Sequence, residues 1–275
     1  MSGPLLSVCL FLLLDASGSV DAQEHKLQRE ATAAALTSPE FLARVEYEGG
    51  IAVAVAEFSN EVTSISDWIA LRSPVEAAVL AEKILTTPRV QDHSTAVGDA
   101  IMYAVTQMKR APACERPVID VSTDGRSNVG LAVDDAVALA RDAGVMVNAL
   151  VIEDPTEPGL LDYYRDAVNG FALPAEWSTY EQSLKMKMTL EIAGHAPALP
   201  EPLSPYFAYY GAVVPLDAPW GGFAGYAYAP LVDLQRHDDA RNPGQFQEPG
   251  RQVTEPSSLV LLAFALVGAI CLARR

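Results

Sequence analysis

Three oxygen-bearing side chains stand at alternate positions near the start of the chain. In the run LLLDASGSV, an apolar stretch ends at Asp15, and Ser17 and Ser19 follow. A carboxylate and two hydroxyls just beyond a buried strand give hard oxygen ligands one common direction, which suits a small divalent cation such as Mg²⁺. The spacing therefore predicts a metal site in this loop. The alternative is that Ser17 and Ser19 only cap a helix that starts near Asp21.

The apolar pattern that surrounds this loop predicts alternating strands and helices. The runs Val8–Leu14, Pro117–Thr123 and Val145–Ile152 are short and continuously apolar, as in parallel strands covered on both faces. Ile51–Phe58 and Val62–Ile69 are rich in strand-forming residues and closely spaced, which predicts an antiparallel hairpin at a sheet edge. Helices are expected at 21–36, 74–85, 98–108, 131–143, 160–168 and 176–192, and a short strand near 171. The predicted fold class is α/β, with a doubly wound, mostly parallel sheet and one antiparallel edge strand.

Two further oxygen-bearing residues occupy comparable places in this pattern. Asp124 follows the run that ends in VSTD, and Thr95 stands in HSTAVGDAI just ahead of a predicted helix. Ligands of open α/β sheets bind outside the carboxyl ends of the strands. Since Asp15 and Asp124 both fall at such ends, we expect the functional site to lie at that edge of the sheet.

Composition excludes one class of partner and leaves the redox state of the cysteines open. The 275 residues include 35 acidic and 19 basic side chains, a net charge of −16, and the Lys and Arg residues form no cluster. Because nucleic-acid binding needs clustered positive charge, we expect no nucleic-acid partner. A bridge between Cys9 and Cys114 is conceivable, but we expect buried free thiols, the commoner state of such residues.

The set Asp15, Ser17, Ser19, Thr95 and Asp124 resembles the metal-ion-dependent adhesion site of von Willebrand factor A (vWA) domains, in which D-x-S-x-S, a Thr and an Asp stand on separate loops. The resemblance implies that these residues hold an octahedral Mg²⁺, with Mn²⁺ or Ca²⁺ as other possibilities, directly or through water. It also implies that one coordination position stays open for a carboxylate of a partner.

The resemblance extends from about residue 7 to 194. Runs such as VIDVSTDGRSNVG and ARDAGVMVNALVI resemble an uncharacterised bacterial branch of the vWA fold, known as a domain of unknown function. In that branch Gly is common where this chain has Thr123, a change that leaves the five candidate ligands intact and alters the rim of the site.

These features favour a non-enzymatic binding module that captures an acidic group of a protein or polysaccharide through the metal. One alternative is a structural protein of the envelope or matrix, in which the metal only stabilises the fold. A magnesium-dependent hydrolase is less favoured, since no nucleophile–base pair or phosphate-binding Gly-rich loop accompanies the candidate ligands.

The last part of the chain changes in composition. We expect the vWA-like domain to span 5–195, a Pro/Gly/Tyr-rich linker of low order to span 196–252, and a sorting or membrane segment to span 253–275. This last segment, in which Glu255 and Pro256 precede an apolar helical stretch and two arginines, resembles the PEP-CTERM sorting signal of Gram-negative bacteria. That resemblance implies recognition by an exosortase at the inner membrane, then removal of the tail and release to the cell surface or the extracellular space.

A permanent C-terminal anchor is the alternative. Export also requires a signal peptide, which is not evident, so we expect the true start codon to lie upstream.

Overall fold

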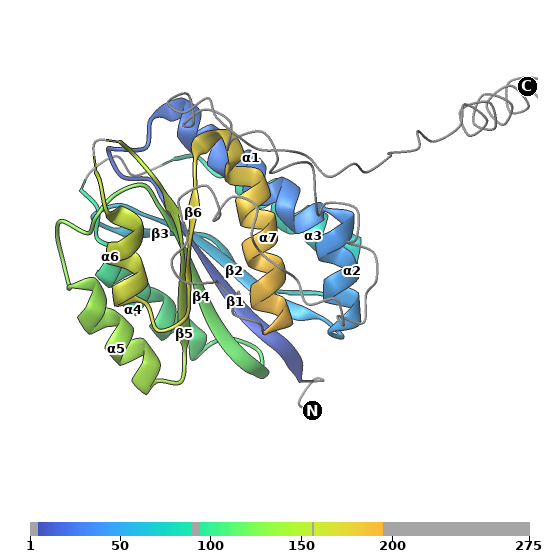
Figure 1. Ribbon diagram of the computed structural model, residues 1–275. Helices are drawn as coiled ribbons and strands as arrows, with labels where there is room; N and C mark the ends of the chain where they lie inside the picture. The colour runs from blue at the N-terminus through green and yellow to red at the C-terminus, as the bar shows by residue number, and fades with distance from the viewer. Residues whose placement is uncertain (1–4, 90–93, 156, 195–275) are drawn as a thin grey trace, which may run out of the picture. The chain divides into compact units, whose positions relative to one another are not determined.

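A six-stranded sheet forms the centre of the molecule in a computed structural model, which describes residues 5–89, 94–155 and 157–194. The strand order is β3-β2-β1-β4-β5-β6, and all neighbours run parallel except β2 and β3 (Figure 1). The strands are β1 (Leu6–Asp15), β2 (Ile51–Phe58), β3 (Val62–Leu71), β4 (Cys114–Thr123), β5 (Met146–Ile152) and β6 (Ala172–Ala175). The predicted doubly wound sheet with an antiparallel edge strand is therefore confirmed.

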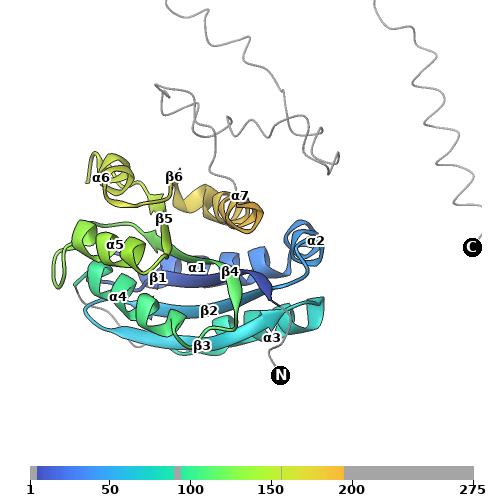
Figure 2. The ribbon, with the colours of Figure 1, turned by 90° about the horizontal axis from the view of Figure 1, so that it is seen from below.

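Helices cover both faces of the sheet (Figures 1 and 2). They are α1 (Ala22–Thr37), α2 (Pro39–Tyr47), α3 (Pro74–Thr86), α4 (Val97–Met108), α5 (Val133–Asp142), α6 (Leu160–Ala167) and α7 (Tyr180–Ala193), with a short 3₁₀ helix at Trp177–Thr179. Side chains of α1, α2, α3 and α7 pack in one apolar cluster, and those of α4, α5 and α6 in another. The sheet is thus the middle of three layers, and β1 lies near its centre.

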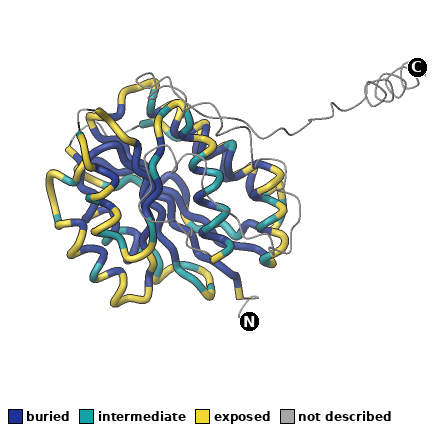
Figure 3. The backbone as a smooth tube through the Cα atoms, in the orientation of Figure 1, coloured by how far each residue is buried: buried dark blue, intermediate teal, exposed yellow. Residues whose placement is uncertain are grey.

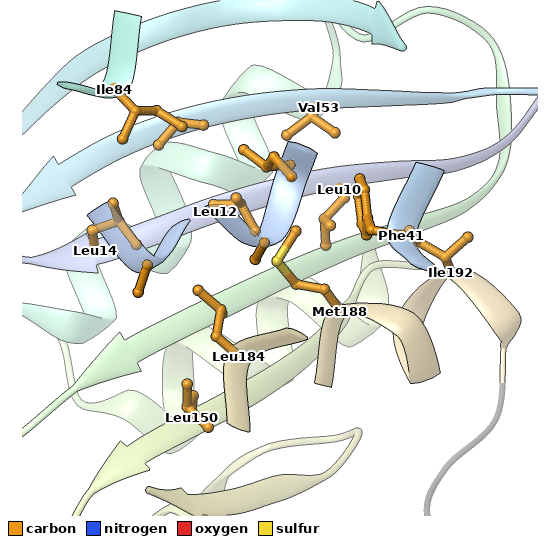
Figure 4. Packing of buried hydrophobic residues seen from close by; sticks show 14 of the residues in the cluster. Leu10, Leu12, Leu14, Phe41, Val53, Ile84, Leu150, Leu184, Met188 and Ile192 are labelled. Carbon is orange, nitrogen blue, oxygen red and sulfur yellow. The ribbon is translucent and has the colours of Figure 1, made fainter. Parts of the chain in front are cut away.

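The two apolar clusters meet the sheet on opposite sides because side chains alternate along a strand. Every residue of β1 is buried, and in the tube view the strands are the most continuously buried part of the molecule (Figure 3). Leu10, Leu12 and Leu14 pack towards α1 and α7 (Figure 4), whereas Phe11 and Leu13 belong to the other cluster. Burial on both faces explains why this strand is continuously apolar in the sequence.

Helix α2 was not predicted from the sequence, although a local signal was present. The side chain of Ser38 accepts a hydrogen bond from the amide of Phe41, and Pro39 occupies the first turn. Ser at the N-cap with Pro at the next position is a typical helix start. Phe41 and Val45, four residues apart, are the buried residues of this helix. The apolar pattern of this helix is short, because the helix has only nine residues.

The cysteine prediction was wrong. Cys9 on β1 and Cys114 at the start of β4 form a disulfide, with Cα atoms 5.8 Å apart. These residues are 105 positions apart in the sequence, and they meet because β1 and β4 are neighbouring strands. The sequence pattern did not reveal that β1 and β4 pair. It therefore gave no reason to expect that the two cysteines would meet.

The predicted linker (196–252) and the predicted sorting segment (253–275) lie outside the described residues. Among the helices that the structure does describe, none has the length and apolar character needed to cross a bilayer.

Candidate metal centre

The candidate ligands lie at the carboxyl ends of β1 and β4 and at the start of α4. Asp15 is the last residue of β1, and Asp124 directly follows β4. The parallel register pairs Leu14 with Ser122, so the two strands end at the same edge of the sheet. Thr95 stands two residues before α4 begins. The topology thus gathers residues that the sequence separates by more than 100 positions.

Direct contacts join four of the five predicted residues, namely Asp15, Ser17, Ser19 and Asp124. The hydroxyl of Ser19 donates a hydrogen bond to Asp124 Oδ1 at 2.6 Å, and it lies 3.1 Å from the hydroxyl of Ser17. Gly125 connects this group with Thr95, since a Cβ atom at Gly125 would lie 3.8 Å from Ser19 Oγ and 4.0 Å from Thr95 Oγ1. The hydroxyls of Ser19 and Thr95 therefore both border Gly125.

Asp15 supports this group from within the fold. Its side chain is fully buried, and its Oδ1 accepts a hydrogen bond from the amide of Ser17 at 2.8 Å. Its Oδ2 accepts a hydrogen bond from the hydroxyl of Thr123 at 2.6 Å. Both carboxylate oxygens are thus engaged by the two loops that carry Ser17 and Asp124. Asp15 therefore ties these loops together.

The alternative that Ser17 and Ser19 only cap α1 is wrong. Asp21 is the N-cap residue, and its Oδ1 accepts hydrogen bonds from the amides of Gln23 and Glu24 at 2.6 and 2.9 Å. The side chain of Glu24 accepts one in return from the amide of Asp21. This reciprocal capping satisfies the first turn of the helix. The two serine hydroxyls are left to the site.

The electrostatics of the site favour a bound cation. Burial raises the pKa of Asp15, against hydrogen bonds from Ser17 and Thr123 and the nearby charge of Arg89. Burial, with a further contribution from the charge of Asp15, raises the pKa of Asp124 to about 7. Two buried carboxylates that repel each other gain stability from a positive charge placed between them. A divalent cation would supply that charge, and the hydroxyls are oxygen donors of the kind it prefers.

Among the described residues, no three His, Cys, Asp or Glu side chains gather in a way that would hold a metal ion. The candidate centre differs in composition, since it has two carboxylates and three hydroxyls. This composition fits a hard cation such as Mg²⁺ better than a soft one.

A cleft of about 530 Å³ opens over the candidate ligands. Its lining includes three of the candidate ligands, Ser19, Thr95 and Asp124, together with Arg126 and Glu157. The guanidinium of Arg126 lies over the ring of Tyr163, 5.2 Å from the ring centroid, which is within the reach of about 6 Å for a cation–π contact. The cleft is large enough to admit a small chemical group beside these candidate ligands.

Sequence reasoning missed three residues that build the site. Thr123 was noted only as a departure from the family pattern, yet its hydroxyl holds Asp15. The hydroxyl of Tyr164 on α6 donates to the carbonyl oxygen of Gly125 at 2.8 Å. Arg89 donates hydrogen bonds to the carbonyl oxygens of Ala16 and Ser17, in the loop between β1 and α1. No sequence pattern signals these contacts, because each joins segments far apart in the chain.

The fold and the loop arrangement together define a vWA-like α/β domain. Among solved structures, the chain is similar to proximal thread matrix protein 1 (PTMP1) from the mussel byssus, with 15% identity and a TM-score of 0.55 over 69% of this chain and 48% of that one. It is also similar to a von Willebrand factor type A protein from Catenulispora acidiphila, with 17% identity and a TM-score of 0.51 over 68% of this chain and 43% of that one. A third similar structure is the vWF domain of the type V pili tip protein Mfa5 from Porphyromonas gingivalis, with 11% identity and a TM-score of 0.52 over 70% of this chain and 97% of that one.

The chain belongs to the family described as "Protein of unknown function (DUF1194)", whose model matches residues 6–196. The matched region of PTMP1 is about half of that protein's length. Among curated proteins, none matches this sequence.

Proposed function

We propose that this chain is an exported binding module that captures an acidic group through a divalent cation held by Asp15, Ser17, Ser19, Thr95 and Asp124. The observation that carries the proposal is the contact of Ser19 with Asp124 at 2.6 Å, beside Ser17, in a loop group that also includes Thr95. These oxygen atoms come from three separate loops, and the neighbouring carboxylates repel each other when no cation is bound.

The bound cation would supply a Lewis-acidic position for an outside oxygen ligand. The chain's own residues would perform the remaining tasks. Asp15 and Asp124 provide negative charge, and the hydroxyls of Ser17, Ser19 and Thr95 provide neutral oxygen ligands. Because only two of the five are anionic, the cation keeps positive charge for a partner. We propose Mg²⁺ as the resident ion, with Mn²⁺ and Ca²⁺ as the alternatives.

The partner that fits this site is a protein or polysaccharide that presents a carboxylate. The net charge of −16 would repel an acidic partner at long range, but salt screens such repulsion beyond about 10 Å. At contact, the local charge of the ion dominates. The cleft of about 530 Å³ gives room for the residue or sugar that bears the carboxylate.

Export is supported by the disulfide between Cys9 and Cys114, since disulfides persist in oxidising compartments and are rare in the bacterial cytoplasm. A cell-surface or extracellular location also agrees with the names of similar structures, which come from a byssal thread matrix and a pilus tip. The proposed route is recognition of the tail by an exosortase, with transient residence in the inner membrane. This route rests on the tail resemblance alone.

The test compares Asp15→Ala with Asp142→Ala, a control in which the replaced side chain is 73% exposed on α5. Each protein is stripped with EDTA and titrated with Mg²⁺ and Mn²⁺ by calorimetry, and folding is verified by circular dichroism. We expect binding by the wild type and the control and none by Asp15→Ala. Envelope extracts are then passed over each immobilised protein with and without EDTA. Recovery of the same acidic partners in both conditions would contradict metal-bridged capture.

A structural role of the metal is the second candidate, favoured by the way Asp15 ties two loops together. It predicts a melting temperature that falls sharply on metal removal while partner capture does not change. A magnesium-dependent hydrolase, the less favoured alternative, predicts turnover that is lost in Asp15→Ala.

A further inference from the structure

Arg89 makes an unusual set of contacts with the first candidate metal loop. Its Nη2 donates to the carbonyl oxygens of Ala16, Ser17 and Val20 at 2.8, 3.0 and 2.9 Å, with one of its two N–H groups shared between two of these acceptors. Its Nη1 lies 3.4 Å from the carbonyl oxygen of Asp21. All four acceptors are main-chain atoms between the end of β1 and the start of α1. One guanidinium therefore holds the whole loop that carries Ser17 and Ser19.

The contacts match what such a loop needs. Carbonyl oxygens that converge on one point repel one another and require a donor with several N–H groups. A guanidinium offers five N–H groups in a rigid fork, whereas an ammonium offers three on a flexible stem. Arg89 is half-buried, and its contacts with Ala16, Ser17 and Val20 are partly buried. Arg89 therefore defines the path of the loop backbone, and through it the direction of the two serine hydroxyls.

The segment that carries Arg89 is itself anchored to the fold. Arg29 on α1 donates to the carbonyl oxygens of Ile84, at 2.7 Å, and of Thr87. Glu57 on β2 accepts a hydrogen bond from Arg29 Nε at 2.7 Å, which fixes this side chain in turn. Arg89 lies two residues after Thr87 in this anchored connection.

We propose that Arg89 is a positioning residue of the metal centre, which pre-orders the Ser17–Ser19 loop for the cation. The proposal rests on the proposed function, since it concerns the same centre. Without the guanidinium, the loop would have to become ordered when the cation binds. The loss of conformational entropy on ordering even one residue weakens binding about tenfold.

The test uses Arg89→Ala, Arg89→Lys and the control Arg141→Ala, whose side chain is 67% exposed on α5. Each protein is stripped with EDTA and titrated with Mn²⁺ by calorimetry, well below its own melting temperature. We expect about tenfold weaker Mn²⁺ binding by Arg89→Ala, an intermediate effect for Arg89→Lys and no change for the control. Addition of millimolar ethylguanidinium should restore part of the affinity of Arg89→Ala and leave the wild type unchanged.

The possible outcomes distinguish a failure of the positioning role from a failure of the proposed function. An Arg89→Ala variant that melts earlier but binds Mn²⁺ as tightly as the wild type would overturn the positioning role, because that is the signature of a residue needed only for stability. If Arg89→Ala does not fold, the same comparison is made with Arg89→Lys, and an unchanged Mn²⁺ affinity there would also overturn it. A wild type that binds no Mn²⁺ would overturn the proposed function first, and this inference with it.

Discussion

The raised pKa of Asp124 predicts that the metal-free protein loses stability as the pH rises towards 8. The pKa of this side chain goes from 3.8 to about 7 on folding, mainly because of burial. The folded state therefore holds a proton that the unfolded state releases near pH 4. The contribution of Asp124 is fully present below pH 4, and it is lost as the pH rises through 7.

The magnitude follows from the size of the shift. A difference of about 3 pKa units corresponds to roughly 4 kcal/mol over the whole range, and roughly 3 kcal/mol of it falls between pH 5 and 8. Asp124 is only 7% exposed, so solvent screening reduces this value little. The raised pKa of the buried Asp15 acts in the same direction. A bound divalent cation would compensate the ionised carboxylates and remove the loss.

Urea denaturation between pH 5 and 8 measures this effect, once in EDTA and once in excess Mg²⁺. In EDTA the free energy of unfolding should fall between pH 5 and 8 by roughly 3 kcal/mol more than it does in Mg²⁺. The variant Asp124→Asn should make the EDTA curve less steep, because no carboxylate ionises at that position. Metal affinity of the wild type should also drop below pH 7, by up to tenfold per pH unit, since a proton competes with the cation.

A flat or rising EDTA curve for the wild type would refute the reasoning, as would a slope that Asp124→Asn leaves unchanged. The exposed substitution Asp142→Asn is the matched control, because it removes a carboxylate that is 73% exposed. Its EDTA curve should follow that of the wild type.

Three further predictions concern groups around and behind the site. Thr123→Val removes the hydrogen bond to the buried Asp15, so it should lower the free energy of unfolding by about 1–3 kcal/mol and weaken Mn²⁺ binding, as measured by urea denaturation and calorimetry. Reduction of the bridge between Cys9 and Cys114, which closes a loop of 105 residues, should cost about 2–4 kcal/mol in the same denaturation assay. Burial raises the pKa of Glu191 to about 8. In excess Mg²⁺, the stability that this group contributes at low pH should therefore be lost as the pH rises through 8. The variant Glu191→Gln should remove that loss.

Each of these predictions has its own control. Thr123→Ser keeps the hydroxyl and should retain most of the stability and the affinity, and equal losses in both variants would contradict the hydrogen-bond argument. A double variant without Cys9 and Cys114 should not respond to reductant, whereas the wild type should. If the alkaline loss of stability persists in Glu191→Gln, another group is responsible for it.

Sequence alone determined the features that depend on neighbours in the chain. The apolar run before Asp15 predicted a strand buried on both faces, and β1 is buried along its whole length. The short polar break between residues 58 and 62 predicted the antiparallel hairpin, which is the pairing of β2 with β3. Alternation of strand and helix was enough to predict that Asp15 and Asp124 end parallel strands at one edge of the sheet. These properties follow from residue spacing, because spacing decides which face a side chain occupies and where a strand ends.

The tertiary structure decided everything that depends on which segments become neighbours. Cys9 meets Cys114 only because β4 pairs with β1, and Thr123 reaches Asp15 for the same reason. The contact of Arg89 with the first loop depends on the path of the chain after α3. Hydrogen bonds and disulfides act over a few ångströms, whereas these partners are separated by 69 to 108 positions in the sequence. Their pairing is set by strand order and helix packing, which residue spacing does not encode.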